Sequence, residues 1–280
     1  MNRSVRRSNA FVWAWTIFVL VVVYLPIACG ALAGLSKSRY FGFPVAKYST
    51  EWWGRAVASI EVQTIVKTSL AIALTVTVVA VLVAFFGALA FARYDWKGRR
   101  LYQKLVLLPI FFPQPVLGLA LLLWFNAIGV QPTWQTAIFA HLVWIIPVVT
   151  LVIAIQVYGF DPALEEAAAD LGAGRLFILR EVTLPILWPG VWSGALFAFL
   201  LSWGNFPLSL YTTGADSTVP EWLYAKMVAG YTPMVPAIGT MSTLAAAALL
   251  LLGGLVAALL RRRAAASAAP PLAEAARAPT

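Results

Sequence analysis

The chain has 280 residues, of which 61% are hydrophobic and only 11% are charged, and its formal net charge is +9. This balance excludes an ordinary soluble domain, in which about 25% of residues are charged, and it indicates a multispanning membrane protein. The single cysteine, Cys29, excludes an internal disulfide.

Six apolar segments are long enough to cross a bilayer, because a hydrocarbon core of about 30 Å needs roughly 20 helical residues. They lie near 11–35, 68–92, 105–128, 136–158, 186–212 and 235–260. Transmembrane strands need only about 10 alternating residues, and a helix satisfies its own backbone hydrogen bonds in lipid. The sequence therefore predicts an all-α integral membrane protein with six transmembrane helices.

The first segment follows a basic tail at 1–10 and resembles a signal peptide, with a lipoprotein-like "LPIAC" ending at Cys29. The apolar run is longer than the core of a signal peptide, about 7–15 residues, and five more spans follow. We therefore predict an uncleaved helix, with 1–10 as a cytoplasmic tail and 11–63 as the first span and a periplasmic segment. The aromatic residues of "YFGFPVAKYSTEWW" are expected at the membrane interface.

The third and fourth segments contain Pro113, Pro115 and Pro147, which are expected only to kink their helices. His141, in the fourth segment, is the only histidine, so a His-based metal cluster is excluded. Within the membrane it either serves as a substrate or proton-relay residue or bonds a neighbouring helix. The sequence contains no P-loop, nucleophile elbow or HExxH, so we predict no catalytic residue, metal or cofactor in this chain.

The stretch "DPALEEAAADLGAGRLFILREVTLPILWPG" is polar where its neighbours are apolar. Asp161 followed by Pro162 predicts a helix start, and Glu165 and Glu166 suit the positive end of the helix dipole. The alanines 167–169 favour helix while presenting a smooth face, which suits docking into another protein's groove. The alternative is an ordinary amphipathic loop.

This first short helix is expected to end at Gly172, which tolerates the left-handed conformation. A second short helix is expected through "GRLFILREV", with Arg175 and Arg180 exposed, and Leu184-Pro185 is expected to stop it at the membrane.

The fifth segment carries polar residues at membrane depth, where they are costly unless used. Ser202, Asn205 and Ser209 follow a spacing of three and four, which places them near one face of a continuous helix. Trp203 lies beside them and is suited to stacking on a ligand. These residues either contact substrate or form interhelical hydrogen bonds.

Basic residues are distributed unequally between the two sides of the six-span topology. Segments 1–10, 93–104, 159–185 and 261–280 hold most of the 20 Lys and Arg residues. Since positive residues stay inside, we predict that both termini and the loop at 161–185 are cytoplasmic. The charges form short clusters next to the membrane, so nucleic acid is not an expected partner. The Ala- and Pro-rich tail at 261–280 is predicted to be disordered.

The loop resembles the EAA loop of permease subunits of binding-protein-dependent ABC importers. Glu166-Ala167-Ala168 is followed at the family's spacing by Gly172, Val182 and Leu184-Pro185. The resemblance covers 11–260 and implies the type I ABC importer permease architecture, with a transmembrane domain at 64–260 and a coupling loop at 161–185. The implied ATPase-coupling residues are Glu165, Glu166, Ala167, Ala168, Gly172, Arg175, Leu184 and Pro185. The candidate residues of the substrate path are His141, Ser202, Trp203, Asn205 and Ser209.

Three stretches resemble the polyamine-type (spermidine/putrescine) branch: "FPVAKYSTEWW", the run from "RYDWKGRR" to "LLLWF", and "SWGNFPLSLYTTGADSTVPEWLYAKM". Many members of this branch carry an acidic pair where this chain has Gly204 and Asn205. A buried carboxylate would balance a cationic solute. The solute therefore remains open between a polyamine and another small organic compound, such as an organophosphonate.

The resemblance implies a bacterial inner-membrane complex with four kinds of partner. These are a second permease subunit, in a heterodimer rather than a homodimer, two copies of a cytoplasmic ATPase that carry ATP and Mg, a periplasmic solute-binding protein, and membrane lipid. The alternatives are an ion-coupled secondary transporter and a non-transporting assembly protein. The first would need charged residues inside the central spans, and the second would not need the EAA spacing.

Overall fold

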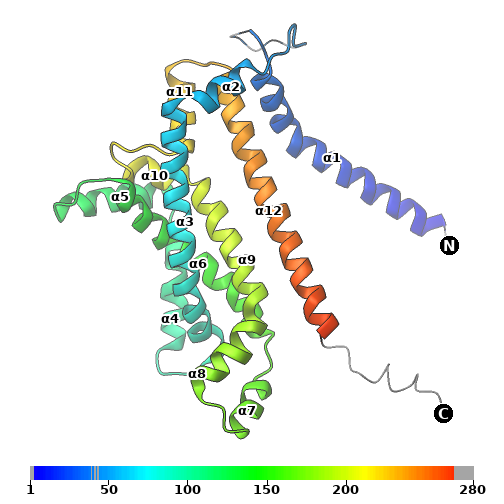
Figure 1. Ribbon diagram of the computed structural model, residues 1–280, viewed down its shortest axis with the longest axis vertical. Coiled ribbons are helices and arrows are strands. Elements are labelled where there is room, and N and C mark those ends of the chain that lie inside the picture. The colour runs from blue at the N-terminus through cyan, green and yellow to red at the C-terminus, as the bar shows by residue number, and fades with distance from the viewer. Residues whose placement is uncertain (1–2, 39, 41, 43, 268–280) are drawn as a thin grey trace. The chain divides into compact units, whose positions relative to one another are not determined.

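The computed structural model describes residues 3–38, 40, 42 and 44–267, and in these ranges the chain is helical apart from loops and one isolated bridge between Ser36 and Tyr48 (Figure 1). It divides into two compact units. The first contains Met1–Thr68 and Ser217–Ala245, and the second contains Ser69–Asp216 and Ala246–Thr280. The candidate residues for ATPase coupling and for the substrate path all belong to the second unit.

The first unit contains α1 (Arg3–Gly34), α2 (Glu51–Ala58), the start of α3 (Ile60–Ala88), α11 (Val219–Ala229) and the start of α12 (Met234–Ser267). The Trp222 indole donates to Glu61 at 2.8 Å, and the Lys226 ammonium lies 3.1 Å from the same carboxylate. The large apolar side chains of α1 between Phe11 and Ile27 are 42–71% exposed. Such a surface suits lipid or another transmembrane helix, not water.

The second unit is built on α6 (Trp134–Tyr158) and α9 (Leu184–Trp203), which share a core with α3. Gly190 and Gly194, one helical turn apart on α9, allow close approach to α6. A Cβ atom added at Gly190 would lie 2.7 Å from Gln156 Cβ, and one added at Gly194 would lie 3.1 Å from Ile153 Cγ1. Small residues at this spacing let transmembrane helices pack backbone to backbone, which in lipid replaces the missing hydrophobic driving force.

Five helices are long and apolar enough to cross a membrane: Phe11–Gly34, Ile60–Arg93, Trp134–Tyr158, Arg175–Trp203 and Met234–Val256. A sixth span exists if the bent pair Arg99–Phe111 and Gln114–Ala127 is one crossing. The predicted all-α membrane architecture is confirmed. The helix α12 continues to Ser267, and 268–280 lie outside the described residues, so the disorder of the tail at 261–280 stays a prediction.

The prediction of one continuous third helix at 105–128 is wrong. The chain forms α4 (Arg99–Leu107), the 3₁₀ turn η2 (Leu108–Phe111) and α5 (Gln114–Ala127), with a bend of 100° between the two halves. Phe112 is extended, with ψ 132°, because the ring of Pro113 disfavours a helical conformation at the preceding residue. By contrast, Pro147 lies inside the unbroken α6.

The fifth span also differs from the expected 186–212. Helical structure begins at α8 (Arg175–Ile178), continues through the π-helical turn η3 (Leu179–Thr183) and runs into α9, so Leu184-Pro185 does not stop the second short helix. Pro185 lies in the first turn of α9, where its missing N–H is tolerated. The helix instead ends at Trp203, and a separate helix, α10 (Phe206–Thr212), follows Gly204 and Asn205.

Candidate functional site

The loop between α6 and α9 forms the helix α7 (Ala163–Asp170), as the sequence predicts. The Asp161 carboxylate accepts a hydrogen bond from the Ala163 N–H at 3.0 Å, which satisfies one of the first backbone donors. Gly172 has φ +85°, the left-handed conformation expected of it, and the Ala173 N–H returns to the Ala168 carbonyl at 3.1 Å. The Asp161 cap at its start and Gly172 after its end therefore limit α7 to about two turns.

The two carboxylates of α7 have different surroundings. Glu166 is exposed, whereas the Glu165 side chain is only 20% exposed. Glu165 Oε2 accepts a hydrogen bond from Arg93 at 2.6 Å, and its Oε1 accepts one from the Thr183 hydroxyl at 2.5 Å. We call Arg93, Glu165 and Thr183 the carboxylate clamp. Sequence reasoning placed Glu165 with the docking residues, but its two oxygens point into the chain.

An apolar surface surrounds the C-terminal end of α7. Leu171, Leu176 and Phe177 are 89%, 78% and 60% exposed. A shallow cavity of about 460 Å³ lies here, lined by Ala168, Leu171, the turn at 172–174 and Phe177. Exposed Arg175 lines a second cavity beside Glu165 and Glu166. Contiguous exposed apolar side chains at a polar rim are typical of protein-binding surfaces.

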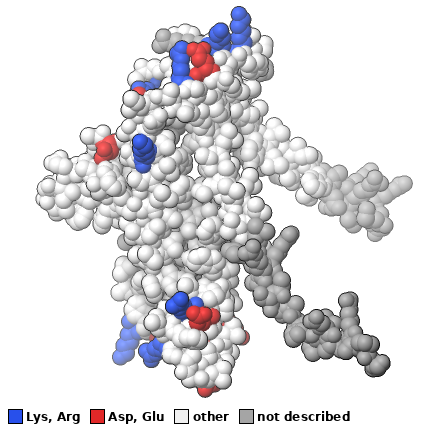
Figure 2. All heavy atoms as spheres, viewed as in Figure 1, with Lys and Arg blue, Asp and Glu red and all other residues white. Residues whose placement is uncertain are grey.

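Charged side chains gather at this end of the second unit, where α4, α7 and α8 lie, and the adjoining helix surface is almost uncharged (Figure 2). Leu184 and Pro185 are not part of the exposed turn. Leu184 packs against the core of α3, α6 and α9, and Pro185 lies on the first turn of α9.

Three other predicted residues meet inside the helix bundle. His141 is 1% exposed, and its Nδ1 lies 2.9 Å from the Ser202 hydroxyl, while its Nε2 lies 3.0 Å from the Ser209 hydroxyl. We call these three residues the histidine cluster. Because Ser202 lies in the last turn of α9 and Ser209 belongs to α10, one imidazole joins α6 to both sides of the helix break. Of the two alternatives for His141, this geometry favours an interhelical role.

Asn205 lies in the break itself, so the three polar residues do not share one face of a continuous helix as the sequence suggested. Its side-chain oxygen accepts from the Leu208 N–H at 3.1 Å and caps α10, and its carbonyl accepts from the Ser209 hydroxyl at 2.7 Å. Trp203 stacks on Phe199 with ring centroids 6.0 Å apart. Both Asn205 and Trp203 therefore have partners within the chain.

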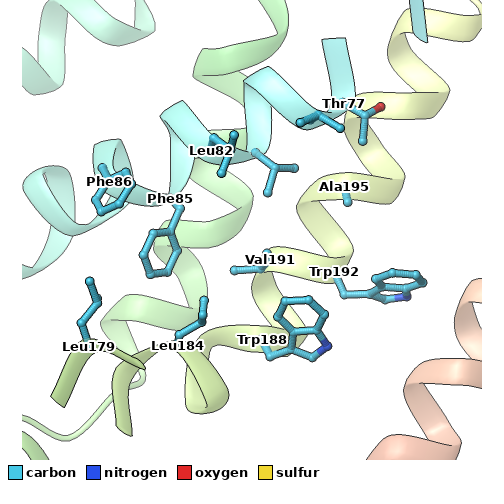
Figure 3. Close-up of a pocket in the computed structure, with 12 residues that line it drawn as sticks. Thr77, Leu82, Phe85, Phe86, Leu179, Leu184, Trp188, Val191, Trp192 and Ala195 are labelled. Atoms are coloured by element: carbon cyan, nitrogen blue, oxygen red, sulfur yellow. The ribbon is translucent and has the colours of Figure 1, made fainter. Parts of the chain in front are cut away.

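A separate apolar cavity of about 480 Å³ lies between α3 and the η3–α9 segment (Figure 3). Phe85 and Phe86 of α3 form part of its wall, and Trp188 and Val191 of α9 form another part. Its one hydroxyl side chain, Thr77, donates to the Ala73 carbonyl. The cavity suits an apolar group and offers little to a polar solute.

Comparison with known proteins identifies the family. Residues 77–266 match the model of the binding-protein-dependent transport system inner membrane component, which is more than half of the chain. The chain belongs to this family of ABC importer permeases.

Relatives of the permease include proteins named for polyamine transport. The spermidine/putrescine transport system permease protein PotC of Haemophilus influenzae is 29% identical over 234 residues, which cover 83% of this chain and 89% of the relative. PotC of Escherichia coli K12 is 27% identical over 224 residues, covering 80% and 84%. The putrescine transport system permease protein PotI of the same strain is 27% identical over 239 residues, covering 81% and 85%.

Solved structures show the same fold. A bacterial ABC transporter that imports the acidic polysaccharide alginate matches with a TM-score of 0.66 and 16% identity, over 90% of this chain and 96% of that chain. The MetNI methionine ABC transporter matches with a TM-score of 0.57 and 19% identity, over 72% and 98%. The permease is thus a multi-pass inner-membrane protein. The comparisons favour neither an ion-coupled secondary transporter nor a non-transporting assembly protein.

Sequence reasoning missed several residues that hold the permease together at these sites. Arg93 appeared only as part of a basic cluster, and Thr183 was not singled out. Thr136 and Asp216 were also missed: the Thr136 hydroxyl donates to the Thr212 carbonyl at 2.6 Å, and Asp216 accepts from the Trp134 N–H at 3.0 Å. Three of these pairs are 72 to 82 residues apart in the chain, and Thr183 is 18 residues from Glu165, so no helical spacing marks them.

Proposed function

We propose that the surface formed by α7 and the following turn docks into a cytoplasmic ATPase and receives the movement that drives import. The observation that carries this proposal is the surface of exposed Ala167 and Phe177 and half-buried Ala168 beside the left-handed Gly172, at the EAA spacing. Glu166 and Arg175 flank the surface and supply charges of both signs. Small side chains let a partner's backbone approach closely, and the flanking charges favour one orientation.

The complex that we infer contains a second, related permease subunit, two copies of the ATPase and a periplasmic binding protein. ATP and Mg belong to the ATPase, and this chain contributes no catalytic residue. A related alginate importer was solved in complex with a periplasmic protein bound to an alginate pentasaccharide, which supports a binding protein as partner. Both termini of this chain are proposed to be cytoplasmic.

We place the solute path beside the break between α9 and α10. Trp203 and Asn205 lie at the break, and the histidine cluster holds the wall behind it. The names of the relatives favour a polyamine. Gly204 and Asn205, at the positions where many polyamine-type members have acids, keep another small organic solute, such as an organophosphonate, as the second candidate.

Docking is tested by purifying the tagged chain together with its partner permease and ATPase. We expect Ala167→Trp to reduce the ATPase recovered per permease by more than about tenfold, since the added bulk would prevent close approach. Val57→Trp, at an exposed position of α2, is the matched control and should leave recovery unchanged. Equal recovery from both variants would remove α7 from the interface.

Orientation has its own test. A cysteine introduced at Ala173 in a Cys29→Ala background should resist an impermeant thiol reagent in intact cells. It should react after the membrane is opened. Labelling of intact cells would place α7 on the side away from the ATPase.

A further inference from the structure

The carboxylate clamp connects two rare backbone features. Arg93 is the last residue of the π-helical turn η1 (Leu89–Arg93), and Thr183 is the last residue of the π-helical turn η3 (Leu179–Thr183). The π-helix accounts for well under 1% of residues and occurs mostly as single turns, frequently at functional sites. In this chain one carboxylate, that of Glu165, contacts the end of both turns.

The clamp also reaches the end of α6. The Arg93 guanidinium lies over the ring of Phe160, 5.2 Å from its centroid, and Phe160 is buried two residues after α6 ends. Glu165 is thereby joined to the ends of α3 and α6 through Arg93 and to the start of α9 through Thr183. Its charge-assisted hydrogen bonds are short and directional, which suits them to couple the position of α7 to these spans.

Glu165 and Glu166 therefore have separate tasks, although they are adjacent in sequence. Both Glu165 oxygens are engaged inside the chain, and the Arg93 and Glu165 side chains are 15% and 20% exposed. A partner protein that bonded Glu165 would compete with Arg93 and Thr183 for its two oxygens. Glu166 is exposed and is not part of the clamp.

We propose that Glu165 is a positioning residue that carries the movement of α7 into α3 and α9 through Arg93 and Thr183, whereas docking to the ATPase depends on its exposed neighbours. This inference rests on the proposed function and assigns a task within it. It separates docking, which needs the outer surface of α7, from transmission, which needs the clamp behind it.

The test uses the complete complex with the partner permease and ATPase. A reporter cysteine replaces Leu210, an exposed residue of α10, in a Cys29→Ala background. Its alkylation rate is measured without nucleotide and with a non-hydrolysable ATP analogue, and the ATPase recovered per permease is measured on the same samples. The variants are Glu165→Gln, Glu166→Gln, the swap Arg93→Glu with Glu165→Arg, and Arg180→Gln, which breaks an exposed ion pair with Glu181.

We expect Glu165→Gln to retain the ATPase and to reduce the nucleotide-dependent change in alkylation rate by at least about fivefold, the lower end of typical coupling between sites. The swap should recover part of that change, because it restores an opposite-charge pair. Glu166→Gln should instead lower ATPase recovery, and Arg180→Gln should leave both measurements unchanged. If the charge variants fail to insert, Thr183→Val and Thr183→Ser provide the same test, since serine retains the hydroxyl and valine does not.

Three results would overturn the inference. Glu165→Gln could lower ATPase recovery as much as Glu166→Gln while the change per assembled complex stays normal, which would make Glu165 a docking residue. The native chain could bind ATPase with no nucleotide-dependent change at α10, or Thr183→Val could behave as Thr183→Ser, and either result would remove the relay. Failure of the native chain to bind the ATPase at all would instead refute the proposed function.

Discussion

Glu165 and His141 each join helices that are far apart in the sequence, and they do so with different chemistry. The carboxylate clamp uses formal charges, with an Arg93–Glu165 distance of 2.6 Å at the charged end of the second unit. The histidine cluster uses one imidazole and two hydroxyls inside the helix bundle. Charge is expensive to desolvate within a bilayer, whereas hydroxyl and imidazole groups need only a hydrogen-bond partner.

The comparison shows that each link lies beside an irregularity in the helices that it joins. The clamp contacts two π-helical turns, and the histidine cluster spans the break at Gly204 and Asn205. At both places the backbone is not held by a regular helical ladder, so side chains supply the missing constraint. Four predictions test this difference between the carboxylate clamp and the histidine cluster.

The largest expected effect is in the histidine cluster. His141→Ala should lower the free energy of unfolding by about 3 kcal/mol, because it removes a fully buried ring and its hydrogen bonds to the Ser202 and Ser209 hydroxyls. Denaturation of the purified protein in detergent measures this change. His141→Gln, which retains hydrogen-bonding groups, should lose less. A loss below about 1 kcal/mol in the alanine variant would mean that the cluster contributes little.

Breaking the clamp should have the next largest effect. Arg93→Met should lower the free energy of unfolding by about 2 kcal/mol, less than for a fully buried pair, since both side chains retain some contact with solvent. The exposed Arg180→Met is the control and should be near neutral. High salt should narrow the difference between Arg93→Met and the native protein, and should not affect the deficit of His141→Ala. If salt changed the stability deficits of Arg93→Met and His141→Ala equally, the clamp and the histidine cluster would not differ in their dependence on charge.

A smaller effect on stability is expected at Gly172, which follows α7 at the charged end of the second unit. Gly172→Leu should cost about 1–2 kcal/mol, because leucine in a left-handed conformation is strained. Gly172→Asn should be tolerated better, since asparagine adopts this conformation more readily. An added Cβ atom meets no atom of the chain within 4 Å, so backbone strain alone is being measured. Insertion into membranes is the control measurement for both variants, and equal stability would show that the turn can relax.

The start of α10 provides the smallest expected effect. Asn205→Leu removes the oxygen that caps the Leu208 N–H and should cost about 1 kcal/mol, whereas Asn205→Ser should retain most of the cap. Uptake of labelled putrescine per assembled complex then separates capping from transport. If leucine and serine reduce uptake per complex equally, Asn205 acts through the solute path and not through the cap.

Sequence reasoning predicted the features that depend on composition and local spacing. The presence of long apolar helices followed from hydrophobicity, and the end of α7 followed from Gly172, whose lack of a Cβ atom has a local effect. It failed where two parts of the chain decide the outcome together. A leucine–proline pair ordinarily ends a helix, yet Pro185 is accommodated in the first turn of α9 directly after a π-helical turn.

The same limit applies to individual site residues. Glu165 and Glu166 are identical in type and equally suited to the helix dipole, and only the fold places Arg93 beside one of them. The spacing of Ser202, Asn205 and Ser209 predicted one face of one helix, but the break at Gly204 turned that pattern into a bridge to His141. Residues 72 and 61 apart in sequence meet at these two sites, and no periodic pattern encodes such pairs.

The glycines at 190 and 194 give α6 and α9 a mechanical character. Since Gln156 and Ile153 occupy the space where their side chains would be, α9 cannot slide along α6 without collision. The two helices are interlocked at these positions, and α9 with its 20 residues is about 30 Å long. If Thr183 moves with Glu165 as proposed, the displacement would act along α9 toward its other end, beside Gly204. The close packing of α9 on α6 therefore depends on Gly190 and Gly194, the two positions that have no side chain.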